Sequence, residues 1–67
     1  MARYHIKNIT TQKYYAGATA GNQPGLWGDI NEARDYSKGE ANESIRRLNA
    51  QFGQDPWNIH AVRERVQ

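Results

Sequence analysis

The sequence lacks cysteine entirely, and it contains no long apolar run. Without cysteine, the chain can form neither disulfide bonds nor thiolate metal sites. The two histidines, His5 and His60, cannot fill a closed structural zinc site without help from carboxylates. No stretch approaches the roughly 20 apolar residues that a membrane-spanning helix needs. We therefore expect a soluble protein that holds no metal and does not insert into a membrane.

Sequence motifs of known catalytic chemistry are also missing. There is no thiol nucleophile, and Ser37 and Ser44 lie outside any nucleophile-elbow motif. A Walker loop, an HExxH motif and a GxGxxG motif do not occur. The small-residue run AGATAG, residues 16–21, lacks the Lys-Ser/Thr ending of a phosphate-binding loop. These absences predict a protein that is not an enzyme and needs no cofactor.

The length of the chain limits its core. A chain of 67 residues forms one domain at most, so we expect a single domain over residues 1–67. A domain of this size buries only about 60% of the surface that its unfolded chain exposes. Because disulfides are excluded, aromatic packing, helix capping or self-association must stabilise it. Two Trp, four Tyr and one Phe provide the aromatic side chains.

Charge is distributed unevenly along the chain. Residues 1–28, 29–55 and 56–67 have net charges of +3, −2 and +1, which give a total of +2. One interpretation is ordinary solvated surface charge. The other is a basic face built from the two ends of the chain and suited to an acidic partner.

Alternating residues predict three strands. In RYHIKNI, residues 3–9, Tyr4 and Ile6 lie on one side of a half-buried strand. The run YYAGATA, residues 14–20, predicts a second strand and a hairpin with the first, before the loop GNQPG at 21–25. In residues 57–66, Trp57, Ile59 and Ala61 are expected to face the core.

A helix over about residues 38–52 is predicted from its capping and its apolar stripe. Ser37 and Glu40 have the spacing of a capping box. The stripe consists of Ala41, Ile45, Leu48 and Phe52. Gly53 suits the left-handed position that ends a helix. On the outer face, Glu43 and Arg47 have favourable spacing for an ion pair.

A shorter helical turn is predicted before that helix. Asp29 and Glu32 have the spacing of a second capping box. Around this turn, apolar residues recur every three positions and are expected to anchor the segment on the core: Trp27, Ile30, Ala33 and Tyr36. The predicted fold is therefore α+β: a small three-stranded antiparallel sheet packed against one main α-helix, with a short extra helical turn, in the order β-β-α-α-β.

The sheet face away from the helix is the main candidate surface. It would display Arg3, His5 and Lys7 from the first strand and Asn58, His60 and Val62 from the third, with Lys13 and Tyr15 joining from the second. Such a face could hold single-stranded nucleic acid, although the aromatic run of RNA-recognition sheets is missing. A protein partner is the alternative, and Val62 hints at a homodimer. For His5 and His60 we expect ordinary exposed or partly covered side chains rather than a metal pair. With two arginines of the helix, the candidate partner-binding residues are Arg3, His5, Lys7, Lys13, Tyr15, Arg46, Arg47 and His60.

The chain also resembles small phage and prophage accessory proteins. The resemblance covers nearly the whole chain and consists of a KYY strand at 13–15 followed by Trp27, Asp29, Ala33, Tyr36, Ser37, Glu40, Ala41, Ile45, Leu48, Pro56 and Trp57. Several proteins of this kind are anti-CRISPR or other anti-defence inhibitors. The resemblance implies a non-catalytic protein in the cytoplasm of a bacterial host, where it would occupy the surface of a host protein or ribonucleoprotein complex. It identifies no target residue by residue. A small single-stranded nucleic-acid-binding module and a virion-assembly subunit are the alternatives.

Overall fold

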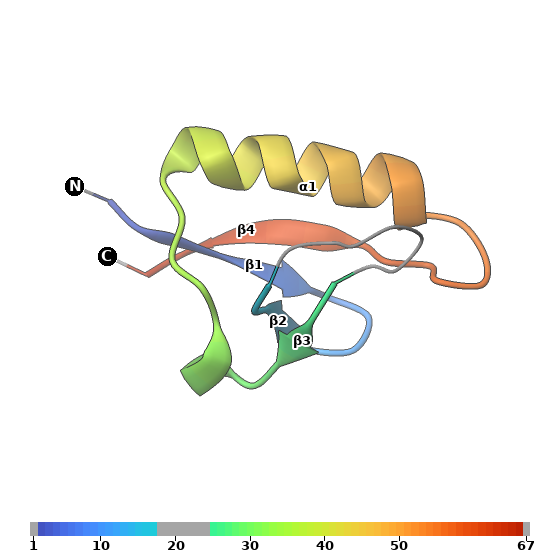
Figure 1. The fold of residues 1–67 in the computed structure, drawn as a ribbon, viewed down its shortest axis with the longest axis horizontal. Helices are drawn as coiled ribbons and strands as arrows, with labels where there is room; N and C mark the ends of the chain where they lie inside the picture. Colours follow the sequence, from blue (N-terminus) through green and yellow to red (C-terminus); the bar gives the residue numbers. More distant parts are fainter. Residues whose placement is uncertain (1, 18–24, 67) are drawn as a thin grey trace.

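An antiparallel sheet with one long helix across it forms the fold of this chain. The structure, a computed structural model, describes residues 2–17 and 25–66. Its elements are β1 (Tyr4–Asn8), β2 (Lys13–Tyr15), β3 (Trp27–Gly28), the 3-10 helix η1 (Ile30–Glu32), α1 (Lys38–Phe52) and β4 (Ala61–Arg65). The strands lie in the order β3-β2-β1-β4, and α1 packs mainly over β1 and β4 (Figure 1). Within the described ranges, no helix has the length and apolar character that crossing a bilayer requires.

The predicted α+β class is confirmed, but the expected three-stranded sheet is wrong because β3 adds a fourth strand. Trp27 and Gly28 pair with Tyr15 and Tyr14 of β2. Two residues cannot show a period-two pattern, so this strand is defined by its partner rather than by its own sequence. The predicted short helical turn forms directly after it as η1, where Glu32 accepts the backbone N–H of Asp29 at 3.2 Å. The predicted loop at 21–25 lies mostly outside the described residues.

The hairpin between β1 and β2 sets which side chains share a face. Lys7 lies opposite Tyr14, and Asn8 lies opposite Lys13. Since side chains alternate along a strand, Tyr14 lies on the face away from α1 and Tyr15 points to the helix side. Tyr15 is only 2% exposed and belongs to the core. Its predicted place on the open face is therefore wrong.

The predicted main helix is confirmed as α1, with its capping box. The Glu40 N–H donates to Ser37 Oγ at 3.3 Å, and the Ser37 N–H donates to the Glu40 carboxylate at 3.2 Å. Gly53 ends the helix with φ −75°, so the predicted left-handed conformation is wrong. A Cβ there would collide with the backbone carbonyl oxygen of Asn49. Glycine at this position is thus required by the close approach of the backbone.

The core lies between α1 and the sheet. Its buried members are Ile6, Tyr15, Ala41, Leu48, Phe52, Ile59 and Ala61, and the partly buried Tyr4, Trp27, Tyr36 and Ile45 pack against them. The stripe predicted for the helix is therefore confirmed. Of the predicted anchors around η1, Trp27 and Tyr36 pack on the core, whereas Ile30 is 56% exposed.

Trp57 does not occupy the core position predicted for it. Its side chain is 46% exposed and meets the Phe52 ring edge-on, with 6.1 Å between centroids. The reason is a turn in which the backbone N–H groups of Trp57 and Asn58 both donate to the Gln54 carbonyl. The last strand consequently begins at Ala61, four residues later than the alternation indicated.

Candidate functional site

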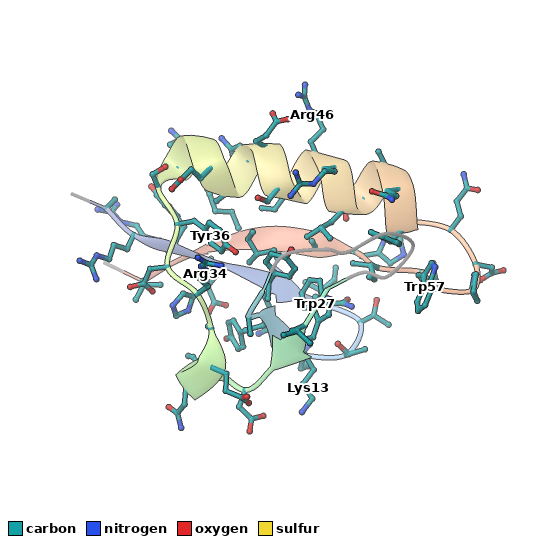
Figure 2. The ribbon with its side chains drawn as sticks, in the orientation of Figure 1. Lys13, Trp27, Arg34, Tyr36, Arg46 and Trp57 are labelled. Carbon is teal, nitrogen blue, oxygen red and sulfur yellow. The ribbon has the colours of Figure 1, made fainter. Side chains whose placement is uncertain are left out.

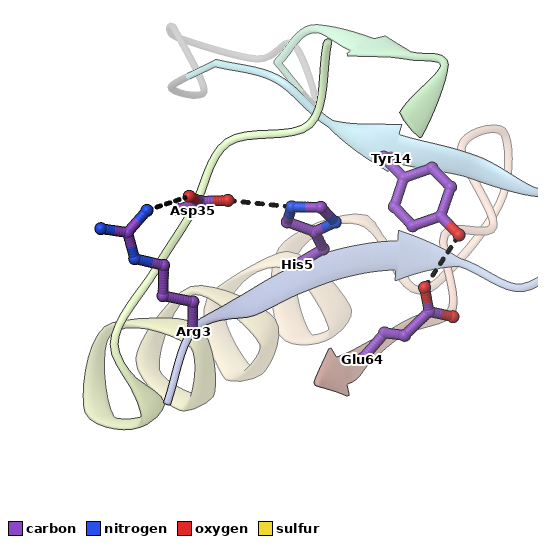
Figure 3. A network of polar contacts seen from close by, with 5 residues as sticks. All are labelled: Arg3, His5, Tyr14, Asp35 and Glu64. Carbon is purple, nitrogen blue, oxygen red and sulfur yellow. Dashed lines mark hydrogen bonds and ion pairs between the residues drawn. The ribbon is translucent and has the colours of Figure 1, made fainter. Parts of the chain in front are cut away.

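Five side chains form a polar network at the sheet face away from α1. β1 provides His5, β2 provides Tyr14 and β4 provides Glu64, while Arg3 precedes β1 (Figure 3). Asp35 comes from the segment that leads from η1 to α1. This network occupies the centre of the face that was predicted to be open and basic.

Asp35 binds two basic residues at once. Its carboxylate lies 3.0 Å from Arg3 Nη1 and 2.9 Å from His5 Nε2. The hydrogen bond to His5, with that to Arg3, holds the pKa of the Asp35 carboxyl below its ordinary value, against the opposing effect of desolvation. Two backbone bonds of 2.9 Å between Tyr4 and Tyr36 lay this segment along the end of β1. As a result, His5 is only 7% exposed and is covered more completely than predicted.

Glu64 provides the second acidic centre of the network. It accepts the Tyr14 hydroxyl at 2.9 Å and lies 3.8 Å from Lys7 Nζ. Lys7 also sits over the Tyr14 ring, 5.6 Å from its centroid, and the His5 ring meets Tyr14 edge-on at 5.7 Å. The hydrogen bond to Glu64 raises the pKa of the Tyr14 hydroxyl above its ordinary value.

The sheet face is therefore not the uncompensated basic surface that the sequence predicted. The charges of Arg3 and Lys7 are offset by Asp35 and Glu64. Lys13 is also paired, with its Nζ 3.4 Å from Asp29. Because side chains alternate along β2, Lys13 lies on the same side as Tyr15, so its predicted place on the open face is wrong as well. Ion pairs of this kind fix local geometry more than they add stability, since most side chains involved are partly exposed.

His60 lies apart from His5. The Ile9 N–H donates to the His60 carbonyl at 3.0 Å, so His60 lies opposite Ile9. Ile9 is four residues after His5, which separates the two histidines by about 13 Å along the strand. His60 is exposed, and its Nε2 lies 3.2 Å from the side-chain oxygen of Asn58. Within residues 2–17 and 25–66, no cluster of three or more His, Asp or Glu side chains is arranged to hold a metal ion.

The two arginines predicted on the helix differ in their partners. Arg46 pairs with Glu43 at 2.8 Å, in place of the predicted pair between Glu43 and Arg47, yet 78% of its side chain is exposed. Arg47 is exposed and forms no ion pair with any described residue. Successive helix residues are rotated by about 100°, so these neighbours project in different directions.

Sequence reasoning named Tyr15 and Arg47 as candidate contacts but did not bring them together with three other residues on the helix side of the sheet. We call this set the Tyr36 face: Tyr15, Trp27, Arg34, Tyr36 and Arg47. The Tyr15 ring lies 5.2 Å from the Trp27 ring and 6.2 Å from the Tyr36 ring, centroid to centroid. Figure 2 shows Arg34 beside Tyr36, where the connecting segment approaches α1, with Trp27 further along and Arg46 pointing away. The only sequence signal for this face was the recurrence of Trp27 and Tyr36 around the short helical turn.

Comparisons of the chain with known protein families, with curated proteins and with solved structures find no match.

Proposed function

We propose that this chain is a non-catalytic interaction protein that inhibits a host nucleic-acid-handling defence complex, of the CRISPR type, by occupying its surface. The class of target comes from the resemblance to small phage accessory proteins. The geometry supports a binding role, because the acids and bases of the sheet face pair with one another and join separate segments of the fold.

The observation that supports this proposal most is the distribution of exposed arginine. Arg47 has no acidic partner in the described structure, and Arg46 keeps most of its side chain in solvent despite its pair with Glu43. Arginine is enriched among the residues that dominate binding energy at protein interfaces. Exposed cations also steer association with an acidic partner. We therefore place the contact on the outer face of α1, in preference to the charge-paired sheet face.

Association with purified CRISPR effector complexes, measured by gel filtration and by inhibition of their cleavage activity, tests the proposal. We expect Arg46→Glu and Arg47→Glu each to weaken association at least tenfold. Lys38→Glu is the matched control, since it reverses one charge in the first turn of the same helix, where a negative charge suits the helix dipole. Failure to associate with any effector would exclude this target class, and equal losses in all three variants would exclude a specific arginine contact.

A further inference from the structure

The Tyr36 face combines aromatic rings with two arginine side chains, Arg34 and Arg47, that form no ion pair within the described residues. Tyr15 is buried at its centre, while Trp27 and Tyr36 on either side keep part of their surface exposed. The Tyr15 and Tyr36 rings are stacked with 26° between their planes. The surface is thus built on rigid rings held by β2, β3 and the segment before α1.

Arg34 is fixed at the rim of this face by its backbone. Its N–H donates to the Tyr15 carbonyl at 3.1 Å. The backbone makes this bond, so the exposed Arg34 side chain is not needed to hold the segment. The next residue in the chain, Asp35, is bound to Arg3 and His5 on the opposite face of the sheet. Arg34 therefore has no ion pair within the described part of the chain.

Arg47 approaches the same face from the helix. It lies seven residues after Glu40, a spacing that puts the two on one flank of α1. The Glu40 carboxylate is engaged by the N–H and hydroxyl of Ser37, at 3.2 and 3.1 Å, as part of the helix cap. Glu43, one turn before Arg47, pairs with Arg46 instead. Glu40 keeps its negative charge but forms no ion pair with Arg47, so the Arg47 guanidinium group can donate to an external anion.

The charges of both Arg34 and Arg47 act on the Tyr36 hydroxyl. Burial raises the pKa of the Tyr36 hydroxyl, with further contributions from Tyr15 and Glu40, while the charges of Arg34 and Arg47 oppose the rise. The Tyr15 hydroxyl is buried and has no hydrogen-bond partner among residues 2–17 and 25–66. The charges of Arg34 and Arg47 therefore act on a hydroxyl whose ring packs against Tyr15.

We infer that the Tyr36 face binds single-stranded nucleic acid, with Arg34 and Arg47 contacting phosphates and the exposed parts of the Trp27 and Tyr36 rings contacting bases. Guanidinium groups recognise phosphate oxygens, and aromatic rings stack on bases of any sequence. A phosphopeptide would use the arginines but not the ring surfaces, so the combination favours nucleic acid. The inference goes beyond the proposed function, because it assigns nucleic acid to a face that shares Arg47 with the proposed protein contact but does not include Arg46.

Fluorescence anisotropy with a labelled single-stranded oligonucleotide of about ten nucleotides, in a range of salt concentrations, tests this inference. Two phosphate contacts predict a slope of log affinity against log salt near about −1.4, since each contributes about −0.7. Arg34→Ala and Arg47→Ala should each reduce the slope to about −0.7. Lys38→Ala is the matched control, since it removes one exposed cation from the same helix, and it should leave both affinity and slope unchanged.

A second readout reports on the rings directly. In a Trp57→Phe background, Trp27 is the only tryptophan left to emit, and the oligonucleotide should quench its emission. Circular dichroism spectra that match the wild type would show that the variants remain folded. The inference is overturned if no oligonucleotide binds at low salt, if Arg34→Ala and Arg47→Ala keep the wild-type slope, or if a phosphopeptide binds while the oligonucleotide does not. Binding of oligonucleotide without association with any defence complex would support this inference and exclude the proposed function alone.

Discussion

Asn49 is predicted to hold the edge strand of the sheet through its carboxamide group. Its Oδ1 accepts the Ala61 N–H at 2.8 Å, and its Nδ2 donates to the Ala61 carbonyl at 3.2 Å. Two bonds show which residues of β4 direct their backbone groups toward β1: the Ile9 N–H donates to the His60 carbonyl, and the Val66 N–H donates to the Arg3 carbonyl. Ala61 consequently presents its backbone groups away from β1. Asn49 thus occupies positions that a further strand would use.

Asn49→Ala should destabilise the fold by a measurable amount. Loss of two hydrogen bonds, each with a net contribution of about 0.5–1.5 kcal/mol, costs about 1–3 kcal/mol. The higher helix propensity of alanine offsets up to about 0.7 kcal/mol of this. Asn42→Ala is a matched control, because it brings the same propensity gain and loses only one exposed bond, from Arg63 Nη1 at 2.8 Å. We expect Asn49→Ala to be less stable than Asn42→Ala by about 1–2 kcal/mol, against a total of roughly 3–10 kcal/mol for a chain of this length.

Urea denaturation of both variants measures this difference, and amide exchange at Ala61 locates it. The Ala61 N–H should exchange faster in Asn49→Ala and be unchanged in Asn42→Ala. Because an uncovered strand edge promotes pairing between chains, Asn49→Ala should also show more self-association by light scattering. Equal denaturation midpoints, together with unchanged exchange at Ala61, would refute the role given to Asn49.

Three further predictions concern stability. Leu48→Ala should cost about 2–5 kcal/mol because its side chain is fully buried, whereas Trp57→Ala should cost distinctly less because 46% of that residue is exposed; urea midpoints compare the two. Asp35→Asn should lose less stability than the wild type as the pH is lowered. The folded pKa of Asp35 is below its ordinary 3.8, so the ionised carboxylate stabilises the fold above that pH, and this stabilisation is lost as the pH falls through the folded pKa. Thermal melts across a pH series would detect the difference. Gly39→Ala should stabilise the helix by about 0.5–1 kcal/mol because a Cβ there meets nothing, while Gly53→Ala should destabilise the protein because a Cβ collides with helix backbone; both are measured by thermal melts.

The main helix and the first strand were predictable because their signals are local. The capping box at Ser37 and the apolar stripe that includes Leu48 both act within a few turns of one helix. The alternation around Ile6 acts within one strand. The strand β3 was missed because its two residues are defined by pairing with β2, which no local pattern contains.

The assignment of side chains to faces failed where it depended on register. The sequence placed Tyr15 on the open face, but the pairing of Lys7 with Tyr14 shifts the second strand by one residue. A shift of one residue exchanges the two faces of a strand. The register is set by the hairpin connection, in which Gln12 adopts a positive φ of 63°, and this conformation is not specified by the residue type.

The prediction of an uncompensated basic face was wrong for a different reason. The acids that neutralise this face are distant from it in the sequence. Asp35 lies 30 residues from His5, and Glu64 lies 50 residues from Tyr14. Charge counts along the chain assign each charge to its own segment, and folding then pairs charges across segments. The acid in the connecting segment was counted with the helix, although its side chain reaches the far face of the sheet.

The same connecting segment explains why the exposed cations lie on the helix side. Extended backbone sends successive side chains to opposite sides, so Asp35 reaches one face of the sheet while Arg34 and Tyr36 reach the other. The backbone pairing of Tyr36 with Tyr4 holds this arrangement at the end of β1. One short segment thereby neutralises the sheet face and adds a cation beside the tyrosine rings. A one-residue insertion before Tyr36 should therefore exchange these effects, leaving Arg3 and His5 without their acid while Arg34 loses its place beside the rings.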